Sequence, residues 1–128
     1  MLNNEIVFIS GASRGIGQAI ALELGRQKAT IIGTATSEKG AENISIYLKN
    51  NHINGFGLSM DVTRPESVEV ALKQTTESYG APSILINNAG VSTMGPTGVE
   101  SYEAAELDRI LNINLKGAFF CARGALRS

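Results

Sequence analysis

Three glycines near the N-terminus, Gly11, Gly15 and Gly17, follow the spacing G-x-x-x-G-x-G directly after an apolar run at residues 6–9. A tight glycine turn between a buried strand and a helix leaves backbone N–H groups exposed at the positive end of the helix dipole. Such a turn can bind a phosphate group without any charged side chain. The spacing differs from the common G-x-G-x-x-G dinucleotide motif, so its meaning depends on the other motifs of the chain.

Two segments that contain asparagine lie further along the chain. Asn87-Asn88-Ala89-Gly90 follows the apolar run 83–86, and Asn112-Ile113-Asn114-Leu115 lies in a stretch with helical spacing. By i, i+3, i+4 spacing, the inward face of that helix contains Leu107, Ile110, Leu111, Ala118 and Ala122. Asn114 shares this face, so we expect a buried amide that needs hydrogen-bond partners. The alternatives are an ordinary strand-end turn at 87–90 and an Asn114 that only stabilises its helix.

Short apolar runs alternate with helical patterns along the chain, which is typical of βαβ units and a parallel sheet. We predict strands at residues 6–10, 30–33, 56–60 and 83–87, and helices at about 15–27, 37–50, 63–79 and 101–128. A loop that contains Gly90, Gly95, Pro96 and Gly98 precedes the last helix. Right-handed crossovers give the strand order 3-2-1-4. The order reverses between strands 1 and 4, where ligands bind at the carboxyl ends, so the glycine and asparagine motifs should meet there.

Finer features of these elements are also predictable. The first helix should turn one apolar face inward, formed by Ile16, Ala19, Ile20 and Leu24. The third helix should begin with a capping box, in which Thr63 caps, Glu66 reaches back and Pro65 occupies the first turn. The unbroken apolar run of the fourth strand predicts burial on both of its faces.

The bulk properties predict one folded globular domain. The chain has 128 residues, of which 43% are hydrophobic and 18% charged. A net charge of −1 gives no electrostatic reason to expect nucleic acid or an acidic membrane as partner, and the apolar runs are too short to span a bilayer. The first five residues do not form a signal peptide. A single cysteine, Cys121, suits a reducing cytoplasm and should be a small buried filler.

Metal binding is not expected, because there is no Cys/His cluster. His52 is the only histidine and lies in a polar turn, where we expect it to be exposed.

Taken together, the motifs resemble the signatures of the short-chain dehydrogenase/reductase family. These signatures are a T-G-x-x-x-G-x-G cofactor loop, N-N-A-G after the fourth strand, and N-x-N-L in the next helix. Here Ser10 replaces the threonine and keeps its hydroxyl, and Ser83 stands where many members have Asp. All three motifs occur in order over nearly the whole chain. The resemblance implies an α/β fold of the Rossmann type and an oxidoreductase.

The segments 11–17 and 32–38 are most similar to the bacterial 3-oxoacyl-(acyl-carrier-protein) reductases of fatty-acid synthesis. This implies NADPH-dependent reduction of a 3-oxoacyl thioester carried on acyl carrier protein, in the cytoplasm, by a homo-oligomer that is a tetramer in the family. Residues 92–106 look more like generic family members. The alternatives are another short-chain alcohol, sugar or hydroxysteroid dehydrogenase, and a nucleotide-binding fragment without catalytic activity.

The resemblance also assigns site residues. The cofactor loop contains Gly11, Ala12, Ser13, Arg14, Gly15, Ile16 and Gly17. Asp61 would bind the adenine amino group with help from the Val62 backbone, and Asp61 can also cap the turn before Thr63. The nicotinamide-side ribose would be lined by Asn88, Ala89 and Gly90. Asn114 would be the asparagine of a catalytic Asn-Ser-Tyr-Lys tetrad, in which it holds a water of the proton relay.

Charge at the end of the second strand predicts which cofactor is preferred. An NAD-preferring fold places a carboxylate there to bind the ribose 2′-hydroxyl. In this chain residues 33–37 contain no carboxylate, and the first acid is Glu38. Arg14 offers a planar cation and Thr36 a hydroxyl, both suited to a 2′-phosphate. We therefore predict NADP(H), against the alternative that Arg14 is an ordinary solvated loop residue.

The Tyr-x-x-x-Lys motif of the family has no match in these residues. Tyr47, Tyr79 and Tyr102 are followed four positions later by Asn51, Ser83 and Glu106. Reduction needs a proton donor for the developing alkoxide, so we expect the 128 residues alone to lack a complete catalytic site. The prediction is a single NADP-binding Rossmann domain at residues 1–128, truncated at its C-terminus relative to the family.

Overall fold

The computed structural model describes residues 1–91, 100 and 103–128. Its centre is a parallel sheet formed by β1 (Ile6–Ser10), β2 (Thr30–Ala35), β3 (Gly55–Ser59) and β4 (Ile84–Asn87). The strand order β3-β2-β1-β4 confirms the predicted topology. In β1, Ile9 lies opposite both Gly33 of β2 and Ile86 of β4. The strand order therefore reverses between β1 and β4, where the glycine turn and the Asn-Asn-Ala-Gly turn both begin.

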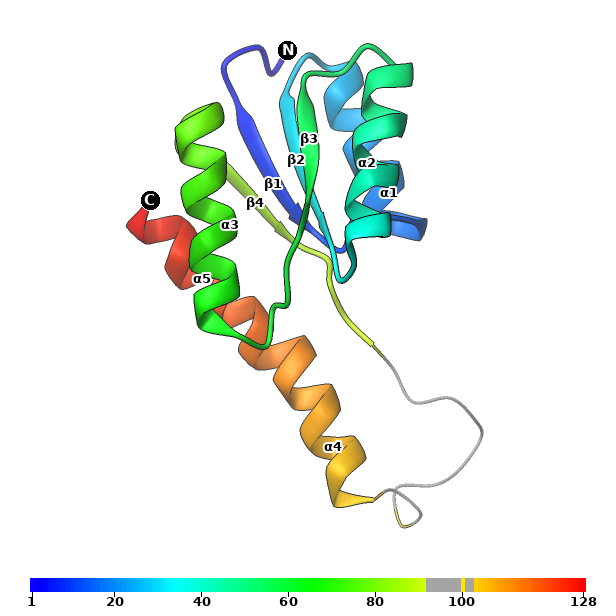
Figure 1. The fold of residues 1–128 in the computed structure, drawn as a ribbon, viewed down its shortest axis with the longest axis vertical. Helices are drawn as coiled ribbons and strands as arrows, with labels where there is room; N and C mark the ends of the chain where they lie inside the picture. Colours follow the sequence, from blue (N-terminus) through cyan, green and yellow to red (C-terminus); the bar gives the residue numbers. More distant parts are fainter. Residues whose placement is uncertain (92–99, 101–102) are drawn as a thin grey trace.

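Helices cover both faces of the sheet (Figure 1). α1 (Gly15–Arg26) and α2 (Glu38–Asn50) lie on one side, and α3 (Pro65–Ser78) and α5 (Gly117–Arg127) on the other. α4 (Ala104–Leu111) is joined to α5 by a five-residue π-helix, Asn112–Lys116. α4 extends away from the sheet, and none of its residues is buried. This arrangement is the Rossmann-type α/β fold that the sequence predicted.

Side chains alternate along the strands and build one hydrophobic core on each face of the sheet. The core toward α1 and α2 includes Val7, Ile9, Ile31, Ile44 and Leu48. The core toward α3 and α5 includes Phe8, Ile32, Val68, Leu72 and Cys121. Because β1 and β2 have helices on both sides, they need the nearly continuous apolar sequence that they have.

The fourth strand is less buried than its sequence predicts. Ile84, Leu85 and Ile86 are each only partly buried. β4 is at the edge of the sheet, because β1 is its only partner among the residues that the structure describes. The prediction of burial on both faces is therefore wrong for this strand.

The face that α1 turns toward the sheet agrees with the prediction only in part, because Ile20 and Leu24 pack against the core but Ile16 and Ala19 are exposed. Its buried residues are Gly17, Ala21 and Gly25, whereas Ile16 is 73% exposed. A Cβ atom on Gly25 would lie 2.5 Å from the Ile53 side chain. The helix packs so closely that only small residues fit at the contact, and the larger residues surround it.

The last helix is rotated relative to the prediction. Leu107 and Leu111 are 52% and 42% exposed, and the buried positions are Gly117 and Cys121. Leu107 and Leu111 are exposed because α4 extends away from the sheet, and the i→i+5 hydrogen bonds of the π-helix insert an extra residue that shifts the buried positions of α5. The predicted start of this helix at Ser101 and the loop residues Gly95, Pro96 and Gly98 lie outside the described residues. Within the described ranges, no helix is long and apolar enough to cross a membrane.

Candidate functional site

The glycine turn joins β1 to α1 at the carboxyl end of the sheet. Gly11 and Gly15 have positive φ angles of 72° and 61°, which L side chains rarely adopt. A Cβ atom on Gly17 would lie 2.0 Å from the carbonyl oxygen of Gly11. The three glycines therefore let the chain reverse tightly enough for α1 to begin within the turn.

The glycine turn and the Asn-Asn-Ala-Gly turn are in direct contact, as the sequence predicted. Asn88 Nδ2 donates to the carbonyl oxygen of Gly11 over 2.7 Å. Ser10 Oγ accepts from the N–H groups of Asn88 and Ala89 at 3.2 and 3.1 Å. The hydroxyl at the end of β1 thus bonds to the chain that leaves β4, and hydrogen bonds join the two motifs at one edge of the sheet.

The first turn of α1 has the features of an anion site. Its N-cap, Arg14, forms no side-chain capping hydrogen bond with the described residues, and the turn contains no acidic residue. A Cβ atom on Gly15 would have no described atom within 4 Å, so the space beside the turn is open. Uncapped N–H groups next to open space fit a phosphate or the pyrophosphate of a dinucleotide.

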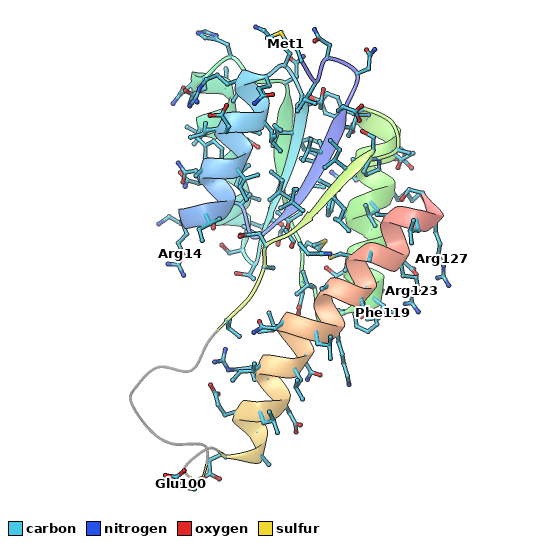
Figure 2. All side chains as sticks on the ribbon, turned by 180° about the vertical axis from the view of Figure 1, so that it is seen from behind. Met1, Arg14, Glu100, Phe119, Arg123 and Arg127 are labelled. Atoms are coloured by element: carbon cyan, nitrogen blue, oxygen red, sulfur yellow. The ribbon has the colours of Figure 1, made fainter. Side chains whose placement is uncertain are left out.

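A cavity of about 580 Å³ lies between this turn and the start of α2. It is lined by Ser13, Arg14, Ser37, Lys39, Gly40, Glu42, Asn43 and Ile46. Arg14 is exposed and extends away from the core at the start of α1 (Figure 2). Thr36, also exposed, is the first residue after β2, and the next residue, Ser37, caps α2 by accepting from the Gly40 N–H over 3.0 Å. The end of β2 therefore offers hydroxyl groups and a nearby cation before the first carboxylate.

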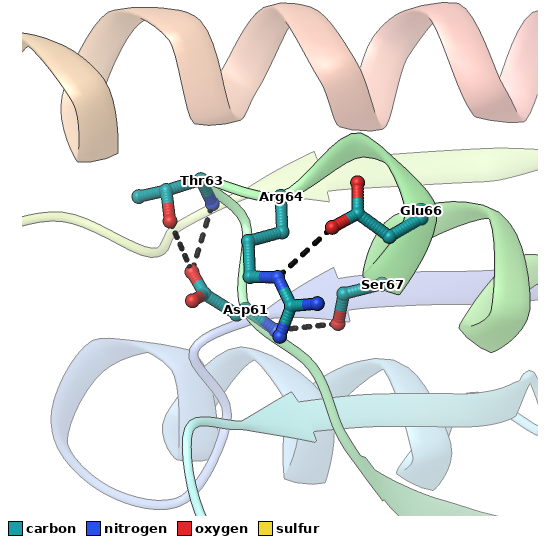
Figure 3. A network of polar contacts seen from close by, with 5 residues as sticks. All are labelled: Asp61, Thr63, Arg64, Glu66 and Ser67. Carbon is teal, nitrogen blue, oxygen red and sulfur yellow. Dashed lines mark hydrogen bonds and ion pairs between the residues drawn. The ribbon is translucent and has the colours of Figure 1, made fainter.

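Asp61 follows β3 and is held by its neighbours in a polar network (Figure 3). Its Oδ1 accepts from the Thr63 N–H at 2.9 Å and from the Thr63 hydroxyl at 2.6 Å. The Asp61 N–H donates to Ser67 Oγ over 2.9 Å. The turn-capping role of Asp61 is thereby confirmed. Its side chain is exposed, so a fixed carboxylate remains accessible to a ligand.

The predicted capping box of α3 is wrong. The N-cap is Arg64, which forms no side-chain capping bond, although Pro65 does occupy the first turn. Thr63 precedes this N-cap, and its hydroxyl donates to the Asp61 carboxylate in a charge-assisted hydrogen bond. Glu66 Oε1 contacts Arg64 Nε at 2.9 Å. A backbone hydrogen bond and this contact hold the pKa of Glu66 below its ordinary value.

The Asn-x-Asn-Leu segment forms the π-helix, and Asn114 is exposed there rather than buried. The expectation of a buried amide is therefore wrong, but the amide does find partners. Asn114 Oδ1 accepts from the Val91 N–H, and Asn114 Nδ2 donates to the Val91 carbonyl, both over 2.8 Å. A Cβ atom on Gly90 would lie 3.2 Å from Asn114 Oδ1, so glycine leaves room for this contact.

Comparison with known proteins identifies the family. A model of the short chain dehydrogenase family matches residues 5–128. The chain belongs to this family. It is 44% identical over 126 residues to the 3-oxoacyl-(acyl-carrier-protein) reductase FabG of Pseudomonas aeruginosa, and 41% identical over 126 residues to FabG of Vibrio cholerae. Each alignment covers 98% of this chain and 50% of the relative, so the chain spans about half the length of the curated relatives it matches.

A solved structure of another short-chain dehydrogenase agrees with the fold. A double mutant of a short-chain dehydrogenase/reductase from Serratia marcescens superposes with a TM-score of 0.89 at 31% identity. The match covers 98% of this chain and 51% of that chain. The fold described above is thus the fold of one half of a short-chain dehydrogenase.

The other residues singled out in the sequence of this short-chain dehydrogenase are packed in the core or exposed to solvent. Val62 is 8% exposed and packs against Gly117, where a Cβ atom would lie 2.6 Å from Val62 Cγ2. Cys121 is buried as predicted, and burial raises the pKa of its thiol to about 11. His52 lies exposed in the turn after α2. No group of three His, Cys, Asp or Glu side chains in the described ranges could hold a metal ion.

Two contacts of the site were not predicted from the sequence. Tyr47, on α2, donates from its hydroxyl to the carbonyl oxygen of Ala12 in the glycine turn over 2.6 Å. Its position three residues after the inward-facing Ile44 was a signal for this orientation. Val91 contacts Asn114 through its backbone N–H and carbonyl, and a backbone contact of this kind cannot be predicted from the residue type.

Proposed function

We propose that this chain binds a nicotinamide dinucleotide and prefers NADP(H) to NAD(H). The observation that carries the proposal is the open, uncapped first turn of α1, framed by Gly11 and Gly15 in left-handed conformations. Membership of the short chain dehydrogenase family supports the same ligand class. In this proposal residues 1–128 act as one cofactor-binding domain.

Each part of the cofactor has candidate residues. The pyrophosphate takes backbone N–H groups of residues 13–17, including that of Ile16, whose side chain is exposed, because the N–H groups of Gly11 and Ala12 donate to Thr34. Asp61 accepts from the adenine amino group, with the Val62 backbone beside it. The ribose next to the nicotinamide rests on the Asn88-Ala89-Gly90 turn, which Ser10 holds in place.

The preference for NADP(H) rests on charge. Arg14 lines the cavity beside α2, and Thr36 lies exposed at the end of β2. A guanidinium group and a hydroxyl suit the 2′-phosphate, whereas residues 33–37 at the end of β2 contain no carboxylate to bind a free 2′-hydroxyl.

The test compares cofactor affinities of Arg14→Ala with those of the unaltered chain. Loss of a charged hydrogen bond to phosphate should weaken NADPH binding about tenfold or more and leave NADH binding nearly unchanged. Arg26→Ala is the matched control, since Arg26 is an exposed residue of the same helix that pairs with Glu23 at 2.8 Å. Equal losses of NADPH and NADH binding in Arg14→Ala would show that Arg14 does not contact the 2′-phosphate.

We further propose that the chain contributes to an oxidoreductase that reduces a 3-oxoacyl thioester carried on acyl carrier protein. The FabG relatives support this substrate class, at 44% and 41% identity. The bound dinucleotide supplies the hydride. Another short-chain alcohol, sugar or hydroxysteroid dehydrogenase would use the same cofactor residues. Two assays distinguish these substrate classes: oxidation of NADPH in the presence of an acetoacetyl thioester, and reduction of NADP⁺ in the presence of secondary alcohols.

A second candidate function is nucleotide binding without turnover. It is favoured by the absence of a Tyr-x-x-x-Lys motif at Tyr47, Tyr79 and Tyr102. In the catalytic proposal Asn114 helps to hold a water of the proton relay. The two hydrogen bonds to Val91 leave a second N–H and a second lone pair of the Asn114 amide for that water. Tight NADPH binding with no oxidation of NADPH by this chain would support the second candidate.

We also propose a cytoplasmic location and a homo-oligomeric state. Four apolar side chains spaced four residues apart are between 42% and 65% exposed along α4, the π-helix and α5: Leu107, Leu111, Leu115 and Phe119. A second copy of the chain would bury this apolar surface. Light scattering should show Leu111→Glu shifted to monomer, whereas Ile46→Glu, at an exposed position of α2, should leave the assembly unchanged.

A further inference from the structure

The side chain of Tyr47 connects α2 to the glycine turn. Its hydroxyl donates to the Ala12 carbonyl oxygen over 2.6 Å. Both residues are buried: Tyr47 is 9% exposed and Ala12 is fully inaccessible. Burial raises the pKa of the Tyr47 phenol to about 12, so the hydroxyl keeps its proton at neutral pH. The glycine turn thus has a permanent hydrogen-bond donor behind it.

The geometry of the peptide group gives this contact a consequence for the outer side of the turn. The peptide between Ala12 and Ser13 is trans, so its C=O and N–H point in opposite directions. Tyr47 holds the C=O toward α2, and the Ser13 N–H therefore points away from α2. The Ser13 N–H has no hydrogen-bond partner among the residues that the structure describes. It is available to an anion at the turn.

The next peptide is held in the same way. Asn43, one helical turn before Tyr47, donates from Nδ2 to the Ser13 carbonyl oxygen at 3.5 Å. This contact is longer and exposed, so it is the weaker of the two. Together the two side chains of α2 direct two successive carbonyl oxygens away from the site of a phosphate, which those oxygens would repel.

Other contacts hold the turn but do not fix this peptide. The Ala12 N–H donates to the Thr34 carbonyl over 2.8 Å, and the Gly11 carbonyl accepts from Asn88. Among the described residues, Tyr47 is the group that reaches the Ala12 carbonyl. Removal of the Tyr47 hydroxyl would leave the buried Ala12 carbonyl oxygen without a hydrogen bond, and the Ala12–Ser13 peptide could then rotate.

We propose that Tyr47 is a positioning residue for phosphate binding, which holds the Ala12–Ser13 peptide so that its N–H faces the pyrophosphate of the bound dinucleotide. The inference rests on the proposed cofactor site, but the residue and its action are separate from those assigned to Arg14. Tyr47 acts on the pyrophosphate through the turn, whereas Arg14 acts on the 2′-phosphate directly.

The test uses two probes, each with one part of the cofactor. ADP contains the diphosphate and lacks a 2′-phosphate, and 2′-AMP has the reverse composition. In Tyr47→Phe the dissociation constant of ADP, measured by NMR titration of the full chain, should rise about two- to tenfold, as expected for one lost hydrogen bond. That of 2′-AMP should stay the same. Tyr79→Phe is the control, because Tyr79 is a 43% exposed tyrosine at the end of α3.

Each outcome decides for or against the positioning role. Unchanged ADP binding in Tyr47→Phe, or equal weakening of ADP and 2′-AMP, would overturn it, since a merely structural defect affects both probes. Should circular dichroism show Tyr47→Phe unfolded, Asn43→Ala replaces it at an exposed helical position. Because Asn43 also lines the cavity beside Arg14, ADP alone is the probe for this variant. Asn43→Ala should weaken ADP binding about twofold, and unchanged ADP binding would overturn the proposal. Failure of the unaltered chain to bind ADP or NADPH would overturn the proposed cofactor site itself.

Discussion

The side-chain amide of Asn114 pairs with the backbone of Val91 through two hydrogen bonds of 2.8 Å, one to the N–H and one to the carbonyl. The pair fastens the chain that leaves β4 to the π-helix between α4 and α5. A π-helix costs regular hydrogen bonding and occurs often at functional sites. Asn114 therefore fixes the Asn-Asn-Ala-Gly turn from one side while Ser10 fixes it from the other.

Replacement of Asn114 by alanine should free the Val91 backbone. Two hydrogen bonds at an exposed site contribute about 1–2 kcal/mol in total to the free energy of unfolding, so we expect a loss of that size in urea denaturation. The Val91 amide should exchange its proton much faster than in the unaltered chain. Asn50→Ala, at the exposed end of α2, is the control. Slow exchange of the Val91 amide in Asn114→Ala would contradict the pairing.

Two glycines of the cofactor loop should respond differently to alanine. A Cβ atom on Gly17 would lie 2.0 Å from the Gly11 oxygen and 2.7 Å from Asn88 Nδ2, so Gly17→Ala must displace backbone and should strongly destabilise the fold. Gly15 has open space around it and only its φ of 61° to strain, a cost of about 1 kcal/mol. Gly15→Ala should therefore fold and lose affinity for ADP, because its methyl group occupies the phosphate space. Thermal unfolding and ADP titration of both variants check this, and equal stabilities would contradict it.

The strand order and the meeting of the two motifs were predictable from the sequence. An apolar run such as 6–9 predicts a buried strand. Right-handed crossovers then leave few topologies for four parallel strands. Ser10, Asn88 and Gly11 therefore met at the predicted edge. This part of the site depends on where the backbone can turn tightly, and the spacing of the glycines indicates such turns in the sequence.

The orientation of the helices was less predictable, because side-chain size decides it along with hydrophobicity. Periodicity favoured Ile16 as a contact of α1, but close packing selected Gly17 instead. In the last helix the π-helix shifted the register, and no periodicity rule anticipates an inserted residue. The hydroxyl of Thr63 donates to the charged oxygen of Asp61, whereas the predicted capping box required it to accept from a backbone N–H in the first turn of α3.

The buried thiol of Cys121 should make stability depend on alkaline pH. Burial raises its folded-state pKa from 9.0 to about 11. The unfolded chain therefore loses this proton near pH 9 while the folded chain keeps it, so the stabilisation present below pH 9 decreases as the pH rises toward 11. Urea midpoints between pH 8 and pH 10 should fall more steeply for the unaltered chain than for Cys121→Ala. The range ends at pH 10 because Tyr47, with a pKa of about 12 in the folded chain, adds its own dependence above that. Parallel pH profiles of the two proteins would contradict this account.

The hydroxyl of Ser10 should contribute to the stability of the fold, because it accepts hydrogen bonds from two N–H donors at once. In Ser10→Ala the N–H groups of Asn88 and Ala89 lose their acceptor at a site where Ser10 itself is 2% exposed. Part-buried donors left without a partner cost about 1–3 kcal/mol, so the free energy of unfolding should fall by that amount. Ser10→Thr keeps the hydroxyl and should retain the amide protection of both residues. Ser59→Ala, at the exposed end of β3, supplies the baseline for a lost serine, and a Ser10→Ala variant as stable as Ser59→Ala would show that the bridge between the two turns contributes nothing.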